Sequence, residues 1–186
     1  MKWARVEHEG RAHYAIVEDE QVRLVRGDPF NGHEPDGRSL PLAGLRWLAP
    51  VIPPNFYAVG LNYTEHVRME AELRGKEPVF PSAPDVGYRS ANALIGHDEA
   101  IVIPADATDR VEYEGEIVGV VGREAKNLSE AEALDCLLGY TIGNDVSERT
   151  WQKSDRTLWR NGLNNHIRRR FDNRTLRRGR QDAHDK

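Results

Sequence analysis

The amino-acid sequence predicts an α+β or mostly-β fold. Short segments in which apolar and polar residues alternate, the pattern typical of half-buried strands, outnumber the segments with helical signals. The two kinds of segment do not alternate regularly along the chain, as they would in a doubly wound parallel sheet. The chain has 186 residues, which fits one domain, or one domain with a small appendage.

The first fifty residues predict a small β module and a linker. Three segments, WARVE, HYAIVE and QVRLV, alternate apolar and polar residues and are expected to be short strands. Five prolines follow between Pro35 and Pro54. We interpret that stretch as a linker, with a short strand or turn around residues 45–48.

The middle of the chain predicts a strand, a helix and a long loop. FYAVG at 56–60 is a compact apolar strand that ends at a glycine. The helix expected after it has Thr64 as its N-cap and Gly75 as its stop. Residues 76–99 are rich in Pro, Gly, Ser, Asn and Asp and are expected to form a long functional loop. AIVIP at 100–104 predicts a short buried strand.

The second half predicts two strands that flank a helix. The segment at 111–121 alternates acidic and other residues and then becomes apolar, as a partly buried strand would. Ser129 and Glu132 have the spacing of a capping box, and Gly139 is expected to end the helix that they start. A further apolar strand is expected at 140–145.

Glu112, Glu114 and Glu116 occupy alternate positions of the expected acidic strand. Because a strand turns successive side chains to opposite faces, all three carboxylates are expected to point the same way. Carboxylates this close repel one another beside an apolar core, and protonation or a cation must relieve the repulsion. A site of carboxylate oxygens suits Mg²⁺, Mn²⁺ or Ca²⁺. The alternative is a half-exposed strand whose polar face is solvated.

Asp145 stands at the end of the strand expected at 140–145. At that position it could supply a third carboxylate from a neighbouring strand. The alternative is that Asn144 and Asp145 form a turn or a cap.

His66 and Glu70 lie four residues apart, so they share one face of the expected helix. A histidine oriented by a carboxylate is a common general base that draws a proton from water. The alternative is an exposed surface pair. Arg89 and Arg149 could bind a substrate carboxylate through a bidentate fork, or could be surface arginines.

Composition leaves several classes of function without support. No apolar stretch reaches the ~18 residues of a membrane span, and MKWARVEHEG lacks the apolar region of a secretory signal. The single cysteine, Cys136, has apolar neighbours and is expected to be a buried thiol in a reducing cytoplasm. Glycine-rich phosphate loops, CxxC zinc pairs and a GxSxG elbow do not occur in the sequence.

Three motifs, VGLNYTEH, YEGEIVGVVG and GYTIGNDVSER, occur in an order and spacing that resemble the fumarylacetoacetate hydrolase (FAH) family, in one of its bacterial branches. The resemblance covers roughly residues 53–160. It implies a partial FAH-type mixed β-roll as the catalytic domain at 51–160. The small N-terminal β module and linker then occupy residues 1–50.

The resemblance also implies a metal site. Family members bind one divalent ion through two glutamates and an aspartate, which correspond to Glu114, Glu116 and Asp145 in this sequence. The expected ion is Mg²⁺ or Mn²⁺, with Ca²⁺ as a further option. Glu112 lies outside the family pattern and is expected near the site without binding the ion. The family's histidine corresponds to His66, as the base that activates water.

Two positions depart from the family pattern. The family often has a glutamate three residues after the histidine, where this chain has Met69, so Glu70 is the nearest acid. A family lysine is replaced by Arg89, which keeps the positive charge. Tyr63 and Arg149 complete the expected substrate-binding residues.

The activity that the resemblance implies is metal-dependent hydrolysis of a β-diketo or 2-oxo acid, such as fumarylacetoacetate or an acylpyruvate. A C–C bond breaks, and the metal stabilises the enolate that leaves. Relatives isomerise or decarboxylate similar acids, and the ligand residues do not distinguish these reactions. The expected partners are a small-molecule substrate and a second copy of the chain, in the cytoplasm, without membrane or nucleic acid.

Residues 161–186 depart most from the family. Residues 160–186 carry 9 Lys+Arg against 3 Asp+Glu, whereas residues 1–159 carry 17 against 27. This tail lacks hydrophobic periodicity and the family's P-x-G-P turn. We therefore expect the chain to be truncated or frame-shifted after about residue 160, with the tail disordered or out of frame. One alternative is a catalytically incomplete paralogue that retains weak metal binding. The other is a basic-tailed nucleic-acid-binding module.

Overall fold

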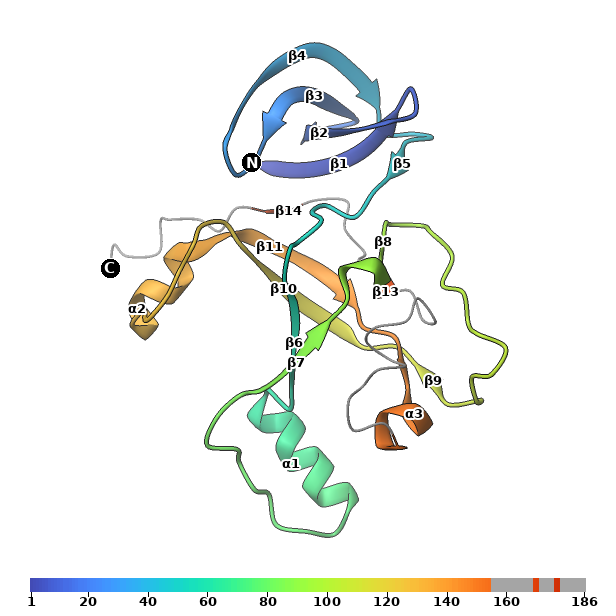
Figure 1. Ribbon diagram of the computed structural model, residues 1–186, viewed down its shortest axis with the longest axis vertical. Coiled ribbons are helices and arrows are strands. Elements are labelled where there is room, and N and C mark those ends of the chain that lie inside the picture. Colours follow the sequence, from blue (N-terminus) through green and yellow to red (C-terminus); the bar gives the residue numbers. More distant parts are fainter. Residues whose placement is uncertain (155–168, 171–175, 178–186) are drawn as a thin grey trace.

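The fold is described from a computed structural model, which covers residues 1–154, 169–170 and 176–177 (Figure 1). The predictions for the tail at 161–186 fall mostly outside these residues and stay predictions. Within the described part the chain is mostly β with few helices, as predicted. None of the described helices combines the length and the apolar character that a membrane span requires.

The N-terminal module is an antiparallel meander in which neighbouring strands pair in chain order. Its strands are β1 (Lys2–His8), β2 (Arg11–Glu18), β3 (Gln21–Asp28) and β4 (Gly32–Pro41), and β5 (Arg46–Trp47) also pairs with β1. The alternating apolar residues face inward and form a core of Ala4, Val6, Ala15, Val22, Leu24 and Trp47. The three strands predicted for this module are confirmed.

The strand β4 was not predicted, because its prolines indicated a linker. β4 is the edge strand of the sheet, where a proline costs least because one side of the strand needs no ladder hydrogen bonds. Pro41 is the last residue of β4, and Pro35 lies beside a shift in the register between β3 and β4. Proline content alone therefore misplaced the boundary of the module.

A two-stranded sheet and a helix follow the module. β6 (Phe56–Gly60) pairs with β7 (Asp85–Arg89), and α1 (Thr64–Leu73) begins shortly after β6. The strand predicted at 56–60 is confirmed. Thr64 is the first helical residue and not the N-cap, which is Tyr63. Gly75 follows the helix with φ +60°, a left-handed conformation that suits glycine at a helix end, as predicted.

The segment 76–99, expected to be a loop, contains three short elements. These are β7, the 3₁₀ turn η1 (Ala91–Ala93) and β8 (Leu94–Ile95). The backbone groups of β6 need a partner strand, and β7 supplies it. AIVIP at 100–104 forms no strand. Val102 and Ile103 are each more than half exposed there, so these two apolar side chains are not packed in a core as the prediction of a buried strand required.

One long antiparallel pair, β10 (Gly115–Val121) with β11 (Leu137–Asn144), crosses the larger part of the molecule (Figure 1). A second antiparallel pair of two-residue strands, β9 (Val111–Glu112) with β12 (Ser147–Glu148), adjoins it. β13 (Arg169–Arg170) and β14 (Leu176–Arg177) pair with β11, and β14 also pairs with β1. A ten-stranded sheet therefore extends from the N-terminal module to β8.

The helix predicted before Gly139 is much shorter than expected. The capping box of Ser129 and Glu132 forms as predicted, but α2 (Glu130–Ala133) passes at once into the 3₁₀ turn η2 (Leu134–Cys136). Gly139 lies inside β11. Of the apolar residues after the box, Leu137 and Leu138 belong to that strand. The sequence did not reveal this, because a short apolar run fits a buried helix or a strand equally well. Cys136 is buried, as predicted.

Candidate metal centre

The acidic strand predicted at 111–121 is interrupted at residues 113 and 114. Glu112 pairs with Ser147 and Glu116 pairs with Gly143, so the two ladders on either side of the break share one register. Across the break, the Asp145 N–H donates to the Glu114 carbonyl at 2.8 Å. The Glu114 N–H donates to Asn144 Oδ1 at 3.2 Å. The Asn144 side chain thus accepts a hydrogen bond from a backbone N–H that would otherwise belong to the ladder.

This register brings three carboxylates together. Glu114 and Asp145 lie opposite each other, and directly opposite residues of an antiparallel pair point to the same face. Glu116 lies two residues after Glu114 and shares that face. The ligand oxygens of Glu114, Glu116 and Asp145 all lie within 4.8 Å of one another. The side chain of Asp145 is only 11% exposed, so the cluster is partly withdrawn from water.

Arg89 lies on the inner side of this cluster. It is the last residue of β7, and its Nε is 3.8 Å from Asp145 Oδ2. Both side chains are nearly buried, at 12% and 11% exposure. A charge contact of this kind offsets part of the cost of burying each group. Arg89 therefore contacts the predicted ligand cluster through Asp145.

Arg149 lies on the outer side, as the first residue of α3 (Arg149–Ser154). Its Nε donates to Glu112 Oε2 at 2.8 Å, and its Nη1 lies 2.5 Å from Glu114 Oε1. The hydrogen bond from Arg149 is the main cause that holds the pKa of Glu112 below its usual value. Burial lowers the pKa of Arg149, but Glu112 and Glu114 outweigh it and the pKa is raised.

The donor set fits a hard divalent cation. Three carboxylates within 4.8 Å repel one another, while Arg89 contacts Asp145 and Arg149 contacts Glu114. Carboxylate oxygens are the ligands that Mg²⁺, Mn²⁺ and Ca²⁺ prefer, and among the residues that the structure describes no softer ligand belongs to the cluster. Glu114, Glu116 and Asp145 are thus the residues of this chain that could hold such an ion.

The structure does not bring His66 or Glu70 to this cluster. His66 is exposed on α1, and Glu70 accepts a hydrogen bond from Arg74 at 2.6 Å. Phe56 at the start of β6 pairs with Arg89, whereas α1 follows the other end of β6. The strand between them spans about 13 Å, at roughly 3.3 Å per residue. In Figure 1, α1 accordingly lies below the β6–β7 pair.

Tyr63 is also exposed, and although it occupies the N-cap position of α1, its side chain makes no capping hydrogen bond. Beside it, Leu61 has φ +46°, a left-handed conformation that a bulky residue rarely adopts. Strained residues of this kind cluster at functional sites. A hollow of about 280 Å³ lies at this end of β6, lined mainly by residues 60–62, Thr64 and residues 80–84, without Tyr63.

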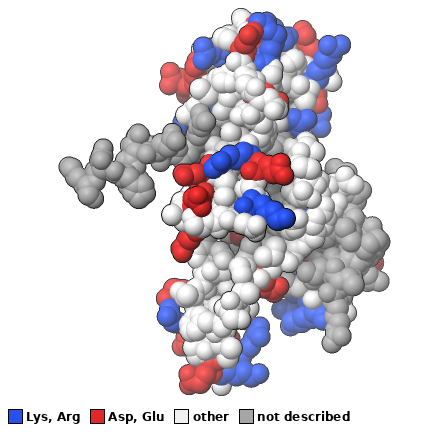
Figure 2. Space-filling view, turned by 60° about the vertical axis from the view of Figure 1, so that its left-hand side comes forward, with Lys and Arg blue, Asp and Glu red and all other residues white. Residues whose placement is uncertain are grey.

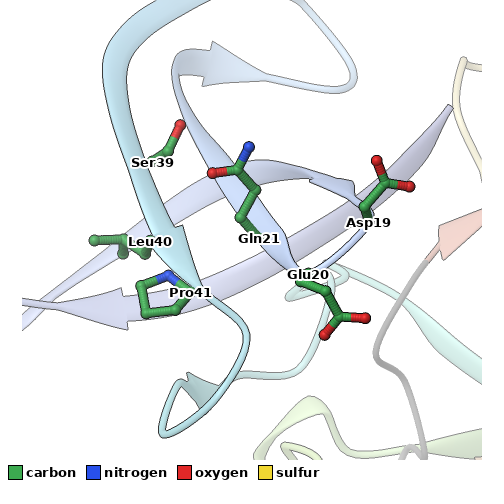
Figure 3. Close-up of a pocket in the computed structure, with 6 residues that line it drawn as sticks. All are labelled: Asp19, Glu20, Gln21, Ser39, Leu40 and Pro41. Atoms are coloured by element: carbon green, nitrogen blue, oxygen red, sulfur yellow. The ribbon is translucent and has the colours of Figure 1, made fainter.

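A second hollow, of about 390 Å³, lies in the N-terminal module between the β2–β3 turn and β4 (Figure 3). Asp19, Glu20 and Gln21 line it from one side and Ser39, Leu40 and Pro41 from the other. None of these residues belongs to the acidic cluster. We therefore assign the candidate chemistry to the cluster and not to this hollow.

Sequence reasoning missed Glu148, which has no exposed surface. Its carboxylate accepts the N–H of Trp151 at 2.5 Å and a hydrogen bond from the Thr108 hydroxyl. A carboxylate that accepts the N–H of the third helical residue is an N-cap, so Glu148 starts α3. The signal was an acidic residue directly before an amphipathic turn. Ser147 beside it lies in β12.

Charged side chains of both signs are interspersed on the face shown in Figure 2. Glu18 with Arg23 and Asp36 with Arg38 are examples of ion pairs among the described residues. A surface of this kind differs from the one-signed basic face of many nucleic-acid-binding proteins. The basic segment at 161–186 lies mostly outside the described residues.

Two family descriptions match the chain. Residues 55–170 match the fumarylacetoacetate (FAA) hydrolase C-terminal family, and residues 1–50 match the Rv2993c-like N-terminal family. Protein Rv2993c of Mycobacterium tuberculosis is 41% identical over 134 residues, which are 72% of this chain and 48% of that protein.

Two further relatives have names that state a reaction. A caffeoylpyruvate hydrolase of Neonothopanus nambi is 42% identical over 98 residues, 50% of this chain and 32% of that protein. The oxaloacetate tautomerase YisK of Bacillus subtilis is 32% identical over 114 residues, 60% of this chain and 36% of that protein. The chain thus spans about half the length, or less, of the curated relatives that it matches.

Solved structures share the fold. The 5-carboxymethyl-2-hydroxymuconate delta-isomerase of Mycobacterium smegmatis matches with a TM-score of 0.80 and 31% identity, over 96% of this chain and 67% of that one. The 2-hydroxyhepta-2,4-diene-1,7-dioate isomerase of Mycobacterium marinum matches with a TM-score of 0.79 and 32% identity, over 96% and 66%.

Proposed function

This chain belongs to the fumarylacetoacetate hydrolase family, and from that membership we propose that it is a metal-dependent enzyme acting on 2-oxo or β-diketo acids. The reaction is C–C bond hydrolysis, or isomerisation or decarboxylation of the same class of acid. One observation carries the proposal: the ligand oxygens of Glu114, Glu116 and Asp145 converge within 4.8 Å.

Each residue of the cluster has a definite task under this proposal. Glu114, Glu116 and Asp145 hold Mg²⁺ or Mn²⁺, which supplies a Lewis acid for the carbonyl next to the substrate carboxylate when it is bound. Arg89 stays a proposed substrate-binding residue, and its Nε lies 3.8 Å from Asp145 Oδ2. Arg149 binds the substrate carboxylate through Nη2, because its Nε and Nη1 already contact Glu112, Glu114 and Gln152.

The proton-transfer residues of the proposal stay the predicted ones. His66 is proposed as the general base, with Glu70 as its partner and Tyr63 as a substrate-binding residue. In this structure Glu70 is paired with Arg74, and His66 is exposed on α1. The metal-binding part of the proposal does not depend on them.

Names of relatives support both kinds of reaction. The caffeoylpyruvate hydrolase acts on an acylpyruvate, and the oxaloacetate tautomerase on a 2-oxo diacid. Both compounds carry a carboxylate beside a carbonyl and an acidic C–H on the next carbon. We therefore propose that the site removes or adds a proton at that carbon. The homodimer, the cytoplasmic location and the division into units at 1–50 and 51–160 belong to the same proposal.

Metal titration tests the proposal directly. We expect Mn²⁺ to release or absorb heat on binding to the parent chain at one site, and to raise its unfolding temperature. Glu114→Ala and Asp145→Ala should each weaken binding at least about tenfold, because each removes one of three charged ligands. Glu18→Ala, which removes an exposed carboxylate of the N-terminal module, serves as the control and should bind as the parent does.

Activity assays then separate the reactions. The Mn²⁺-loaded chain is incubated with an acylpyruvate and, separately, with the enol form of oxaloacetate, and the loss of enol absorbance is followed. Turnover of the acylpyruvate supports the hydrolase, and turnover of the enol alone supports the tautomerase. Metal binding without turnover of either compound contradicts the enzyme and supports the catalytically incomplete paralogue. An absence of metal binding contradicts both.

A further inference from the structure

Glu112 lies outside the family's ligand pattern, yet it contacts an arginine that also reaches one of the proposed ligands. Its Oε2 accepts the Nε–H of Arg149 at 2.8 Å, and the same guanidinium reaches the ligand Glu114. We propose that Glu112 is a positioning residue of the metal centre: it holds Arg149 beside Glu114 and cancels its charge, so that a divalent cation can bind next to an arginine. This inference rests on the metal-binding function proposed above.

The guanidinium of Arg149 is fixed by three neighbours. Nε is bound to Glu112, whereas Nη1 lies 2.5 Å from Glu114 and donates to Gln152 Oε1 at 3.0 Å. Because the guanidinium is planar, contacts at both Nε and Nη1 fix the orientation of its plane. A loss of the Nε contact would let the group swing towards the remaining carboxylate, which is Glu114.

The backbone explains why these residues meet. Glu112 pairs with Ser147 in the short ladder between β9 and β12, and Arg149 begins α3 two residues later. The Arg149 N–H also donates to the Arg110 carbonyl at 3.0 Å. Arg149 is therefore attached to the strand that carries Glu112 by its backbone as well as by its side chain.

The positive charge of Arg149 affects how strongly the neighbouring ligands can bind a metal ion. A guanidinium that touches a metal ligand repels the cation that the ligand is to bind, and this repulsion is strong where water is partly excluded. The Arg149 side chain is 23% exposed, so water screens it incompletely. Glu112 places one negative charge within hydrogen-bond distance of the Arg149 guanidinium, so the Glu112–Arg149 pair carries no net charge. The three ligands then keep their full negative charge for the metal.

A plain surface ion pair would behave differently. Glu112 is 49% exposed and also lies 3.7 Å from Arg110, so the pair could be a local contact without effect on the centre. Exposed pairs of that kind contribute little to stability and nothing to a neighbouring site. The two interpretations differ in one measurable quantity, the dissociation constant for the metal.

A double-mutant cycle on the full chain measures this quantity. Mn²⁺ binding is followed by titration calorimetry in the parent, Glu112→Gln, Arg149→Met and the double variant. We expect Glu112→Gln to weaken binding about tenfold, because Arg149 is left unneutralised beside Glu114. Arg149→Met should tighten binding, since the competing cation is gone. In the Arg149→Met background, Glu112→Gln should change the dissociation constant less than about twofold.

Two further variants serve as controls. Glu112→Asp keeps the charge with a shorter side chain, and its dissociation constant should stay within about threefold of the parent value. Glu18→Gln removes one charge from the exposed Glu18–Arg23 pair of the N-terminal module, where Arg23 Nη2 donates at 2.7 Å. That variant has the same change of net charge as Glu112→Gln and should bind Mn²⁺ like the parent.

Several outcomes would overturn the inference. An unchanged dissociation constant in Glu112→Gln, or a loss of equal size with and without Arg149, would show that Glu112 does not act through Arg149. If Glu112→Gln does not fold, Arg149→Met decides alone, and weaker binding in that variant contradicts the proposal. A parent chain that binds no Mn²⁺ overturns the proposed function together with the inference, whereas the other outcomes leave the function intact.

Discussion

Glu148 combines full burial with ionisation. Burial raises the pKa of its carboxyl, but the hydrogen bonds from Thr108, the Trp151 N–H and Thr150 outweigh burial and hold the pKa below its usual value. A carboxylate stabilised in this way caps α3, the helix that carries Arg149. The orientation of the outer arginine therefore depends on a residue outside the ligand cluster.

The depressed pKa predicts a pH dependence of stability. A carboxyl with a lower pKa in the folded state stabilises the fold above its unfolded pKa, and that stabilisation is lost as the pH falls through the folded pKa. Glu148→Gln should therefore lower the free energy of unfolding by about 1–3 kcal/mol at pH 7. The difference from the parent should shrink below about pH 4. Denaturant unfolding at both pH values measures it, and a constant difference would contradict the prediction.

The ligand cluster was predictable from the sequence because alternation fixes the face of Glu114 and Glu116. Asp145 was predictable as the end of a neighbouring strand, and the register supplies the convergence. The contact between Glu112 and Arg149 was not predictable. It depends on the pairing of β9 with β12, which joins residues 37 positions apart and leaves no local pattern in the sequence.

At the scale of elements, β10 has two very different faces. Val120 is 8% exposed and packs with Trp3, Ile16 and Val25 of the N-terminal module. Its neighbour Val121 is 58% exposed on the opposite face. Strand alternation accounts for this difference, since successive side chains point to opposite faces, although the register against β11 shifts between these two residues.

This pair gives a matched test of the fold. Val120→Ala should lower the free energy of unfolding by about 2 kcal/mol, because it removes two buried methyl groups and leaves a cavity. Val121→Ala makes the same chemical change on the exposed face and should cost less than about 0.5 kcal/mol. Chemical denaturation of both variants measures the difference. Equal losses would mean that the exposed face is covered in solution.

The positions of strands and helices were less predictable than the face of a strand to which each side chain points. β4 contains Pro35 and Pro41 and was taken for a linker, because only the sheet order reveals that it is an edge strand. The run after Ser129 has sequence signals for a helix start and a helix stop, yet only Glu130–Ala133 forms an α-helix. Leu134–Cys136 form the 3₁₀ turn η2, and the residues from Leu137 onward enter β11, where pairing with β10 satisfies their backbone groups.

At the scale of the molecule, the N-terminal module and the larger part are packed against each other. The core cluster of Trp3, Ile16 and Val25 includes Val120 from β10. The turn after β8 also approaches β5: a Cβ on Gly96 would lie 2.2 Å from the Trp47 carbonyl oxygen. Arg46 of β5 bridges Glu7 and Glu99 at 2.7 and 3.3 Å. The module thus supports the segment that leads towards the metal centre.

The close approach at Gly96 predicts that this junction stabilises the whole fold. Gly96→Ala should lower the free energy of unfolding by about 1–3 kcal/mol, because the added methyl group meets backbone atoms of Trp47 and Leu48 that cannot move aside alone. Gly115→Ala is the matched control, since its added methyl group meets no atom within 4 Å. Calorimetric unfolding without metal compares the two. If Gly96→Ala unfolds like Gly115→Ala, the two parts do not pack this closely in solution. A loss confined to Gly96→Ala, with the module and the larger part still unfolding in one transition, means that the junction couples them into one cooperative unit.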